Sequence, residues 1–203
     1  MAAELPRLIV ITDWSRPQLL ERLDDALGAG PGIAVQHRNV GVNDREFLLQ
    51  ARTVQRLCAR RGAPLFVNRR LDVALLVGAH LHLPSSGLLA TDVRPHLPNG
   101  RWVSAAVHDE AEAARAAGAD LALVSPVFAP LSKPEERSPL GVAGFVALAK
   151  KLACPAYALG GVSPVSVEPL LPVAGVAVIS AVLDASRPRD AAARLLQLVG
   201  ERR

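Results

Sequence analysis

The chain has 203 residues, 50% of them hydrophobic, which is enough for one buried core and short for two ordinary domains. Its net charge of +4 comes from arginines spread along the chain, and only 3% of its residues are aromatic, a combination that argues against a nucleic-acid-binding surface. Neither Cys58 nor Cys154 has a second cysteine or a histidine at metal-ligand spacing, so both thiols are expected to be reduced and buried.

The first residues, MAAELPRLIVITD, lack the basic start and the longer apolar stretch of a secretion signal. No apolar segment of about 18 residues is free of charge, so a membrane span is not expected either. Together these observations predict a cytoplasmic protein.

Eight short apolar runs alternate with amphipathic stretches of period near 3.6, and two of those stretches close at Gly62 and Gly118. The runs span residues 8–12, 33–36, 64–67, 80–83, 102–107, 121–127, 156–159 and 176–179. Near-continuous apolar strands are typical of a parallel sheet covered on both faces, so the pattern predicts an α/β protein, a single (β/α)₈ TIM barrel over residues 1–203. The alternative is a doubly wound open sheet, but no GxGxxG follows the first run.

In such a barrel the residues just after each strand form the active site. Gln36 and Arg38 share the inward face of the second strand, where an amide and a guanidinium without partners are costly, so they indicate an anionic ligand. The alternative is that Arg38 lies at the rim and only pairs with a loop carboxylate.

Paired glycines, Gly160 and Gly161, follow the seventh run, and Ile179 and Ser180 follow the eighth. Glycine lets backbone N–H groups approach a ligand closely, and the turns after strands seven and eight are the usual phosphate cradle of these barrels. The sequence therefore predicts a phosphate site there.

Three further features leave alternatives open. His108 ends the fifth run, before Asp109 opens a helix, and suits either proton transfer or helix entry. The long Pro-rich loop 125–141 carries Lys133 and is either a lid that reaches an anion or a solvated loop. His82 and His37 are more often partly buried and hydrogen-bonded than ligands.

The motifs, taken in order, resemble the thiamine-phosphate synthase and TenI family over nearly the whole chain. They are QHR at 36–38, NRRLDVAL at 68–75, LHLPS at 81–85, VHDEAEAARAAGAD at 107–120, SPVFAPLSKP at 125–134, ALGGV at 158–162 and GVAVIS at 175–180. The resemblance implies a (β/α)₈ barrel, a phosphorylated thiazole-type ligand and, more weakly, a homodimer.

In the synthase branch, hydroxymethylpyrimidine diphosphate is joined to a thiazole phosphate and pyrophosphate leaves. Its pattern resembles QxRxK, NDRxD and HLGQxD, in which the Asp after Asn and the last Asp hold Mg²⁺. Here Arg69 and Gly87 stand at those two carboxylates, and Val40, Ala106 and Pro130 stand at a lysine, a serine and a threonine. Gln36, Arg38, Asn68, His82 and Lys133 match the substrate-binding pattern.

TenI proteins resemble the chain better at those points, with NGRVD and QLPSG in place of NRRLD and HLPSS. They are thiazole tautomerases that need no metal, so the resemblance predicts a metal-independent tautomerase of thiamine biosynthesis with no cofactor. His108 would be its base, the backbone at Gly160, Gly161 and Ser180 would hold the phosphate, and Arg38 or Lys133 would meet the carboxylate.

Two other functions stay open. One is a divergent thiamine-phosphate synthase that recruits other acids for Mg²⁺. The other is a non-catalytic barrel that binds a phosphorylated ligand, because the catalytic serine and threonine positions hold Ala106 and Pro130.

Overall fold

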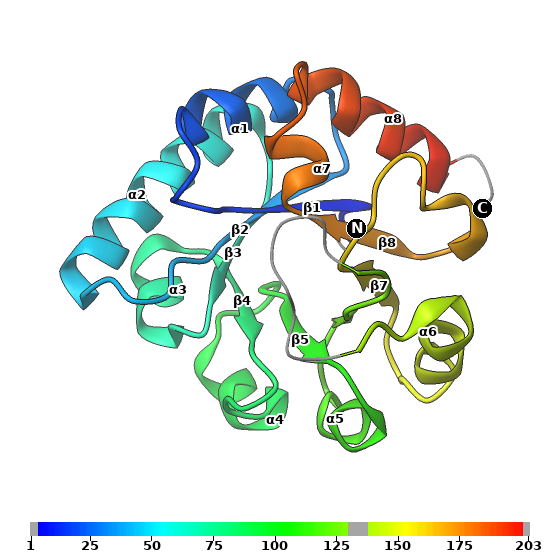
Figure 1. The fold of residues 1–203 in the computed structure, drawn as a ribbon. Helices are drawn as coiled ribbons and strands as arrows, with labels where there is room; N and C mark the ends of the chain where they lie inside the picture. The colour runs from blue at the N-terminus through cyan, green and yellow to red at the C-terminus, as the bar shows by residue number, and fades with distance from the viewer. Residues whose placement is uncertain (1–3, 130–137, 201–203) are drawn as a thin grey trace.

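The computed structural model describes residues 4–129 and 138–200, in which parallel strands close into a barrel surrounded by helices (Figure 1). The strands are β1 (Leu8–Ile11), β2 (Ile33–His37), β3 (Leu65–Asn68), β4 (His80–Leu83), β5 (Val103–Val107), β6 (Leu121–Val124), β7 (Ala156–Leu159) and β8 (Gly175–Val178). The helices are α1 (Leu19–Leu27), α2 (Asp44–Arg61), α3 (Leu71–Val77), α4 (Ala90–Val93), α5 (Glu110–Arg115), α6 (Gly141–Ala149), α7 (Ser180–Leu183) and α8 (Pro188–Gly200), with 3₁₀ turns η1 (Arg94–His96) and η2 (Glu168–Leu170). No helix in these ranges is long and apolar enough to cross a membrane.

The strands follow one another around the barrel in chain order, and β8 pairs with β1. This confirms the predicted (β/α)₈ barrel and excludes the open sheet. Each of the eight predicted runs coincides with a strand, although the sixth strand ends at Val124 because the chain then turns toward α6. Gly62 ends α2 in the left-handed conformation, as predicted, whereas α5 already ends at Arg115.

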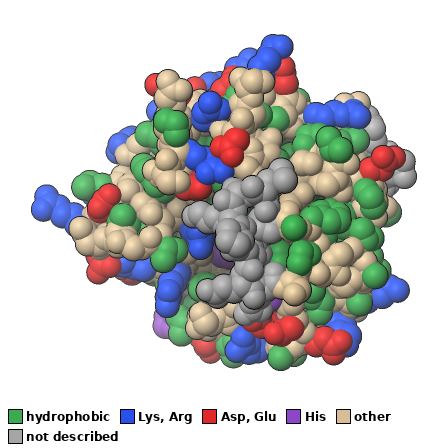
Figure 2. Space-filling model, viewed as in Figure 1, with side chains coloured by type: hydrophobic (Ala, Val, Ile, Leu, Met, Phe, Trp, Pro, Cys, Tyr) green, Lys and Arg blue, Asp and Glu red, His purple; other side chains and the backbone are tan. Residues whose placement is uncertain are grey.

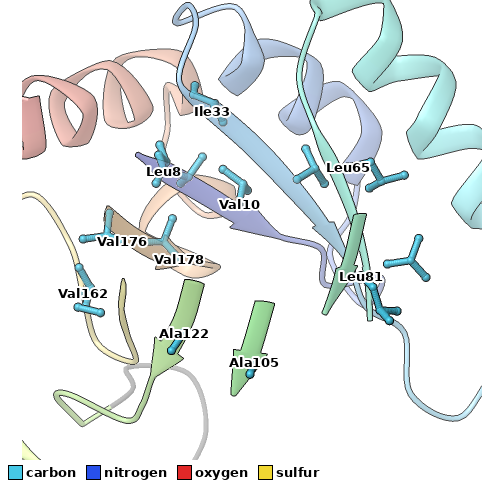
Figure 3. Packing of buried hydrophobic residues seen from close by; sticks show 14 of the residues in the cluster. Leu8, Val10, Ile33, Leu65, Leu81, Ala105, Ala122, Val162, Val176 and Val178 are labelled. Carbon is cyan, nitrogen blue, oxygen red and sulfur yellow. The ribbon is translucent and has the colours of Figure 1, made fainter. Parts of the chain in front are cut away.

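Alternate residues of each strand face opposite sides of the barrel wall. One set, which includes Leu8, Val10 and Ile33, packs against the surrounding helices in the larger buried cluster (Figure 3). The other set fills the barrel and consists of Ile9, Ile11, Ala34, Phe66, Leu121, Leu123, Tyr157 and Ala177. Burial of each large apolar side chain contributes about 1.5–3 kcal/mol, so both faces of the sheet stabilise the barrel.

The same alternation sets the direction of the polar residues. Gln36 is two residues beyond Ala34 on β2 and therefore shares its inward direction. Asn68 pairs with His82 in the parallel register, and His82 pairs with Ser104, so these side chains lie at one level, near the carboxyl ends of β3 and β4 and near the start of β5. The register thus brings polar groups from β3, β4 and β5 to one level, while Gln36 on β2 is level with Phe66, one inward layer earlier.

Three strand histidines are buried. His37 faces outward, accepts a hydrogen bond at Nδ1 from Trp14 Nε1 (3.3 Å) and packs on Phe47, and burial lowers its pKa to about 4. His80 stacks on Trp102 with ring centroids 4.4 Å apart, and burial lowers its pKa to about 4. These two rings are neutral at physiological pH and serve packing.

We predict that the protein loses stability as the pH falls from 6.5 toward 4. Because the unfolded state binds protons on these histidines near pH 6.5 and the folded state does not, acid favours unfolding. For His37 alone the loss at pH 5 is about 2 kcal/mol. Urea unfolding at pH 7.5 and pH 5 should show a smaller difference for His37→Gln than for the parent, with His96→Gln on the surface as the matched control. Equal pH dependence of parent and His37→Gln would contradict this.

Candidate active site

The carboxyl end of β2 holds a buried amide with an unused acceptor. Gln36 is 2% exposed, and its Oε1 has no hydrogen-bond partner among the residues that the structure describes. A buried acceptor without a donor costs about 1–3 kcal/mol. A ligand group that donates a hydrogen bond to Oε1 would recover this free energy. Gln36 therefore remains a predicted ligand-binding residue.

His82 lies on β4, near the same rim. Its Nδ1 lies 2.8 Å from Ser104 Oγ, and the ring is 5% exposed. Burial, with smaller electrostatic contributions from Arg38 and His108, lowers the pKa of His82 to about 3. His82 is therefore a neutral hydrogen-bonding group. Ser104 is a site residue that the sequence analysis missed, since nothing in the sequence marks it as the partner of a residue on the next strand.

Arg38 follows β2 at the rim. Its backbone N–H donates to Thr12 Oγ1 and its carbonyl accepts from the same hydroxyl, both at 2.9 Å, so the end of β2 is fastened to the end of β1. Within residues 4–129 and 138–200 no carboxylate pairs with the guanidinium of Arg38, so the alternative of a rim ion pair has no support there.

His108 is held by a carboxylate that the sequence analysis overlooked. Glu112 is 7% exposed, and its Oε2 lies 2.6 Å from His108 Nδ1 and accepts the backbone N–H of His108 at 2.8 Å. An ionised carboxylate only accepts, so Nδ1 donates and Nε2 is the nitrogen left for a ligand. The i,i+4 spacing of the two residues was the available signal. Asp109 caps α5 by accepting from the Glu112 N–H, which keeps the carboxylate in place.

The glycines after β7 approach another part of the chain closely. Gly160 and Gly161 have φ of 92° and 62°, and a Cβ would lie 2.9 Å from Pro126 Cα at the first and 2.7 Å from Ala129 O at the second. The need for glycine here therefore comes from the segment after β6, whereas the sequence analysis attributed it to a ligand. Ile179 precedes α7, and Ser180 is the first residue of this helix. The phosphate cradle after β7 and β8 remains a prediction.

We predict that Gly161→Ala destabilises the barrel more than Gly62→Ala does. Both glycines have nearly the same φ, 62° and 64°, but a Cβ at Gly62 meets nothing within 4 Å. The left-handed conformation alone costs about 1 kcal/mol, and the clash at Gly161 adds about 1–3 kcal/mol. Denaturant unfolding of both variants measures the difference, and equal losses of unfolding free energy would show that the contact with Ala129 is not tight.

Asn68 and Lys133 are the other predicted site residues. Asn68 is half-buried at the end of β3, and its carbonyl accepts from the Arg70 N–H at 2.8 Å. Lys133 lies outside the described residues, as do residues 130–137 of the proposed lid.

The positions that hold Mg²⁺ in the synthase pattern do come together. Arg69 and Gly87 line one cavity of about 360 Å³ between the ends of β3 and β4, with Leu83, Pro84, Ser86 and Leu88. None of these residues carries a carboxylate, and Mg²⁺ needs oxygen ligands. In the described part of the chain, no cluster of three or more His, Cys, Asp or Glu side chains could hold a metal ion. The residues present do not fit Mg²⁺.

Side chains from β2, β3, β4 and β5 thus converge at the carboxyl ends of a parallel barrel, which is where enzymes of the (β/α)₈ class bind their substrates. The chain belongs to the thiamine monophosphate synthase family, whose model matches residues 8–182.

Named relatives agree with this family. A thiamine-phosphate synthase of Chloroflexus aurantiacus is 32% identical over 95% of this chain and 92% of its own length. One from Synechococcus is 36% identical over 94% of this chain, which spans only 56% of that longer protein. The solved structure of a thiamine phosphate pyrophosphorylase from Pyrococcus furiosus aligns with a TM-score of 0.82 and 30% identity, covering 96% of each chain.

The prediction of a TenI-like thiazole tautomerase is wrong. Relatives that are 31% to 36% identical over most of the chain carry the synthase name, whereas the prediction depended on two short segments around Arg69 and Gly87. Loss of two metal carboxylates changes how a site neutralises negative charge. It does not by itself change the reaction, because other cations can neutralise the same charge.

Proposed function

We propose that this chain is a thiamine-phosphate synthase, a transferase that joins hydroxymethylpyrimidine diphosphate to a thiazole phosphate and releases pyrophosphate. The observation that carries the proposal is the similarity over almost the full chain to relatives with that name. The polar rim supports it, because both substrates carry phosphoryl groups and polar atoms that need partners.

In this proposal the β2 to β5 half of the rim binds the pyrimidine substrate. Gln36 Oε1 accepts from a donor on the ligand, and neutral His82 and Asn68 supply further hydrogen bonds. His108 presents Nε2 to the ligand in an orientation fixed by Glu112. Arg38 adds a positive charge beside His82.

The β7 to β8 half would bind the thiazole phosphate. Gly160, Gly161, Ile179 and Ser180 follow the carboxyl ends of these two strands, where backbone N–H groups can donate to phosphate oxygens. The two substrates would then meet above the centre of the barrel, which holds the reacting atoms close together.

We predict that the purified protein releases pyrophosphate only when both precursors are present. Gln36→Met should lower kcat/KM about 10- to 100-fold, because the ligand donor loses its acceptor. The free energy of unfolding of Gln36→Met should not fall, since the substitution removes an unsatisfied buried acceptor. Gln55→Met, on α2, is the matched control.

Coupled phosphate detection measures the pyrophosphate, and mass spectrometry identifies thiamine phosphate. Absence of product at saturating concentrations of both precursors, with and without Mg²⁺, would refute the proposed function. It would favour a barrel that binds a phosphorylated ligand without converting it.

A further inference from the structure

The cavity between the ends of β3 and β4 has the chemistry of an anion site. It measures about 360 Å³, within the usual range of ligand pockets of about 300–1,000 Å³. Its polar side chains are the guanidinium of Arg69 and the hydroxyl of Ser86, both of which can donate hydrogen bonds to an anion.

Arg69 is exposed, and its ion pairing differs from that of its neighbour Arg70. Charges of both signs are mixed over this side of the molecule (Figure 2), so individual pairings decide which arginines are free. Arg70 pairs with Asp72 (2.6 Å) and with Asp44 (2.5 Å). Among the described residues, by contrast, no carboxylate pairs with Arg69.

Asp72, the acid that remains from the synthase pattern, is also engaged. Both of its carboxylate oxygens accept from Arg70, and the hydrogen bonds with Arg70 lower the pKa of Asp72. The carboxylate nearest in sequence to Arg69 is therefore bound to a neighbouring guanidinium, and within residues 4–129 and 138–200 no acidic side chain compensates the charge of Arg69.

The backbone at Arg69 adds a second observation. Its φ is 68°, a left-handed conformation that favours glycine, and the Arg70 N–H donates to Asn68 O at 2.8 Å across the tight turn. The Arg69 N–H donates to His82 O at 2.8 Å, which ties the turn to the end of β4. Residues other than glycine that are held in this conformation are concentrated at functional sites, which supports a role for this turn in ligand binding.

We propose that Arg69 binds the diphosphate of the pyrimidine substrate directly, so that binding and departure of this group need no Mg²⁺. The inference rests on the proposed synthase function. A guanidinium matches two phosphoryl oxygens in a bidentate geometry and stays charged at all physiological pH values. It therefore places one positive charge directly beside the diphosphate, in the position where the synthase pattern has a carboxylate that holds Mg²⁺.

The reaction balances without a further reactant. The thiazole nitrogen forms a bond to the methylene carbon of the pyrimidine, and the bond from this carbon to the diphosphate oxygen breaks. The electron pair leaves with pyrophosphate, and Arg69 stabilises the added negative charge on its oxygens. No proton transfer to the leaving group is needed.

The first test is titration of the protein with pyrophosphate by calorimetry in excess EDTA. The parent should bind, and Arg69→Gly should bind at least about 10-fold more weakly. Arg52→Ala, which removes an exposed arginine in the middle of α2, is the matched control and should bind as the parent does. Pyrophosphate binding by the parent only with Mg²⁺, or equally strong binding by Arg69→Gly, would overturn the proposal.

The fold of the variant is tested in the same samples. Glycine adopts the φ of residue 69 without strain, so the Tm of Arg69→Gly should equal that of the parent or exceed it by up to about 4 °C. A Tm well below that of the parent would mean that Arg69 has a structural role, and would overturn the proposal.

A converse variant and two assays of the parent protein separate this inference from the proposed function. Arg69→Asp combined with Gly87→Asp returns both carboxylates to the cavity and should make pyrophosphate binding depend on Mg²⁺. If the parent forms thiamine phosphate only with Mg²⁺, the synthase function stands and the role of Arg69 fails. If the parent binds pyrophosphate through Arg69 in EDTA but forms no product, the anion site stands and the synthase function fails.

Discussion

The parallel register of the closed sheet decides where the polar side chains of this chain lie. Because every strand runs in the same direction, all carboxyl ends meet at one rim, and alternate residues of each strand point into the barrel. The lower part of the interior is filled by apolar residues such as Ile9 and Phe66. Polar residues stand at the level of some of these apolar ones: Gln36 pairs in register with Phe66, and Ser104 pairs with His82.

Desolvation determines which side chains at this rim carry a charge. A buried imidazole stays neutral, so His82 contributes hydrogen bonds and no charge, while the positive charge comes from arginines at the edge. The two halves of the rim offer different donors. The β3 to β4 half has a guanidinium at Arg69, and the β7 to β8 half has backbone at Gly160 and Gly161. Both kinds of donor suit phosphoryl oxygens, which agrees with a reaction between two phosphorylated substrates.

The two branches of the family show how much a short motif indicates about function. Arg69 and Gly87 were read as evidence against the synthase because Mg²⁺ would lose its ligands. The full-length similarity to synthases reverses that conclusion, and the proposed role of Arg69 would reconcile the two observations. In that proposal an arginine, in place of an aspartate and its bound cation, keeps positive charge beside the diphosphate. A motif defines the means of charge neutralisation more directly than it defines the reaction.

The sequence by itself determined the order of strands and helices, the barrel and the rim on which the site lies, because hydrophobic periodicity and helix ends are local properties of the chain. It also indicated Gln36 and His108, which end or directly follow apolar runs, and His82, which lies within one. Only the tertiary structure decided that Arg70, and not Arg69, pairs with Asp44, and that Gly161 packs on Ala129. Those contacts join residues far apart in sequence, and their distances are fixed by barrel closure and strand register.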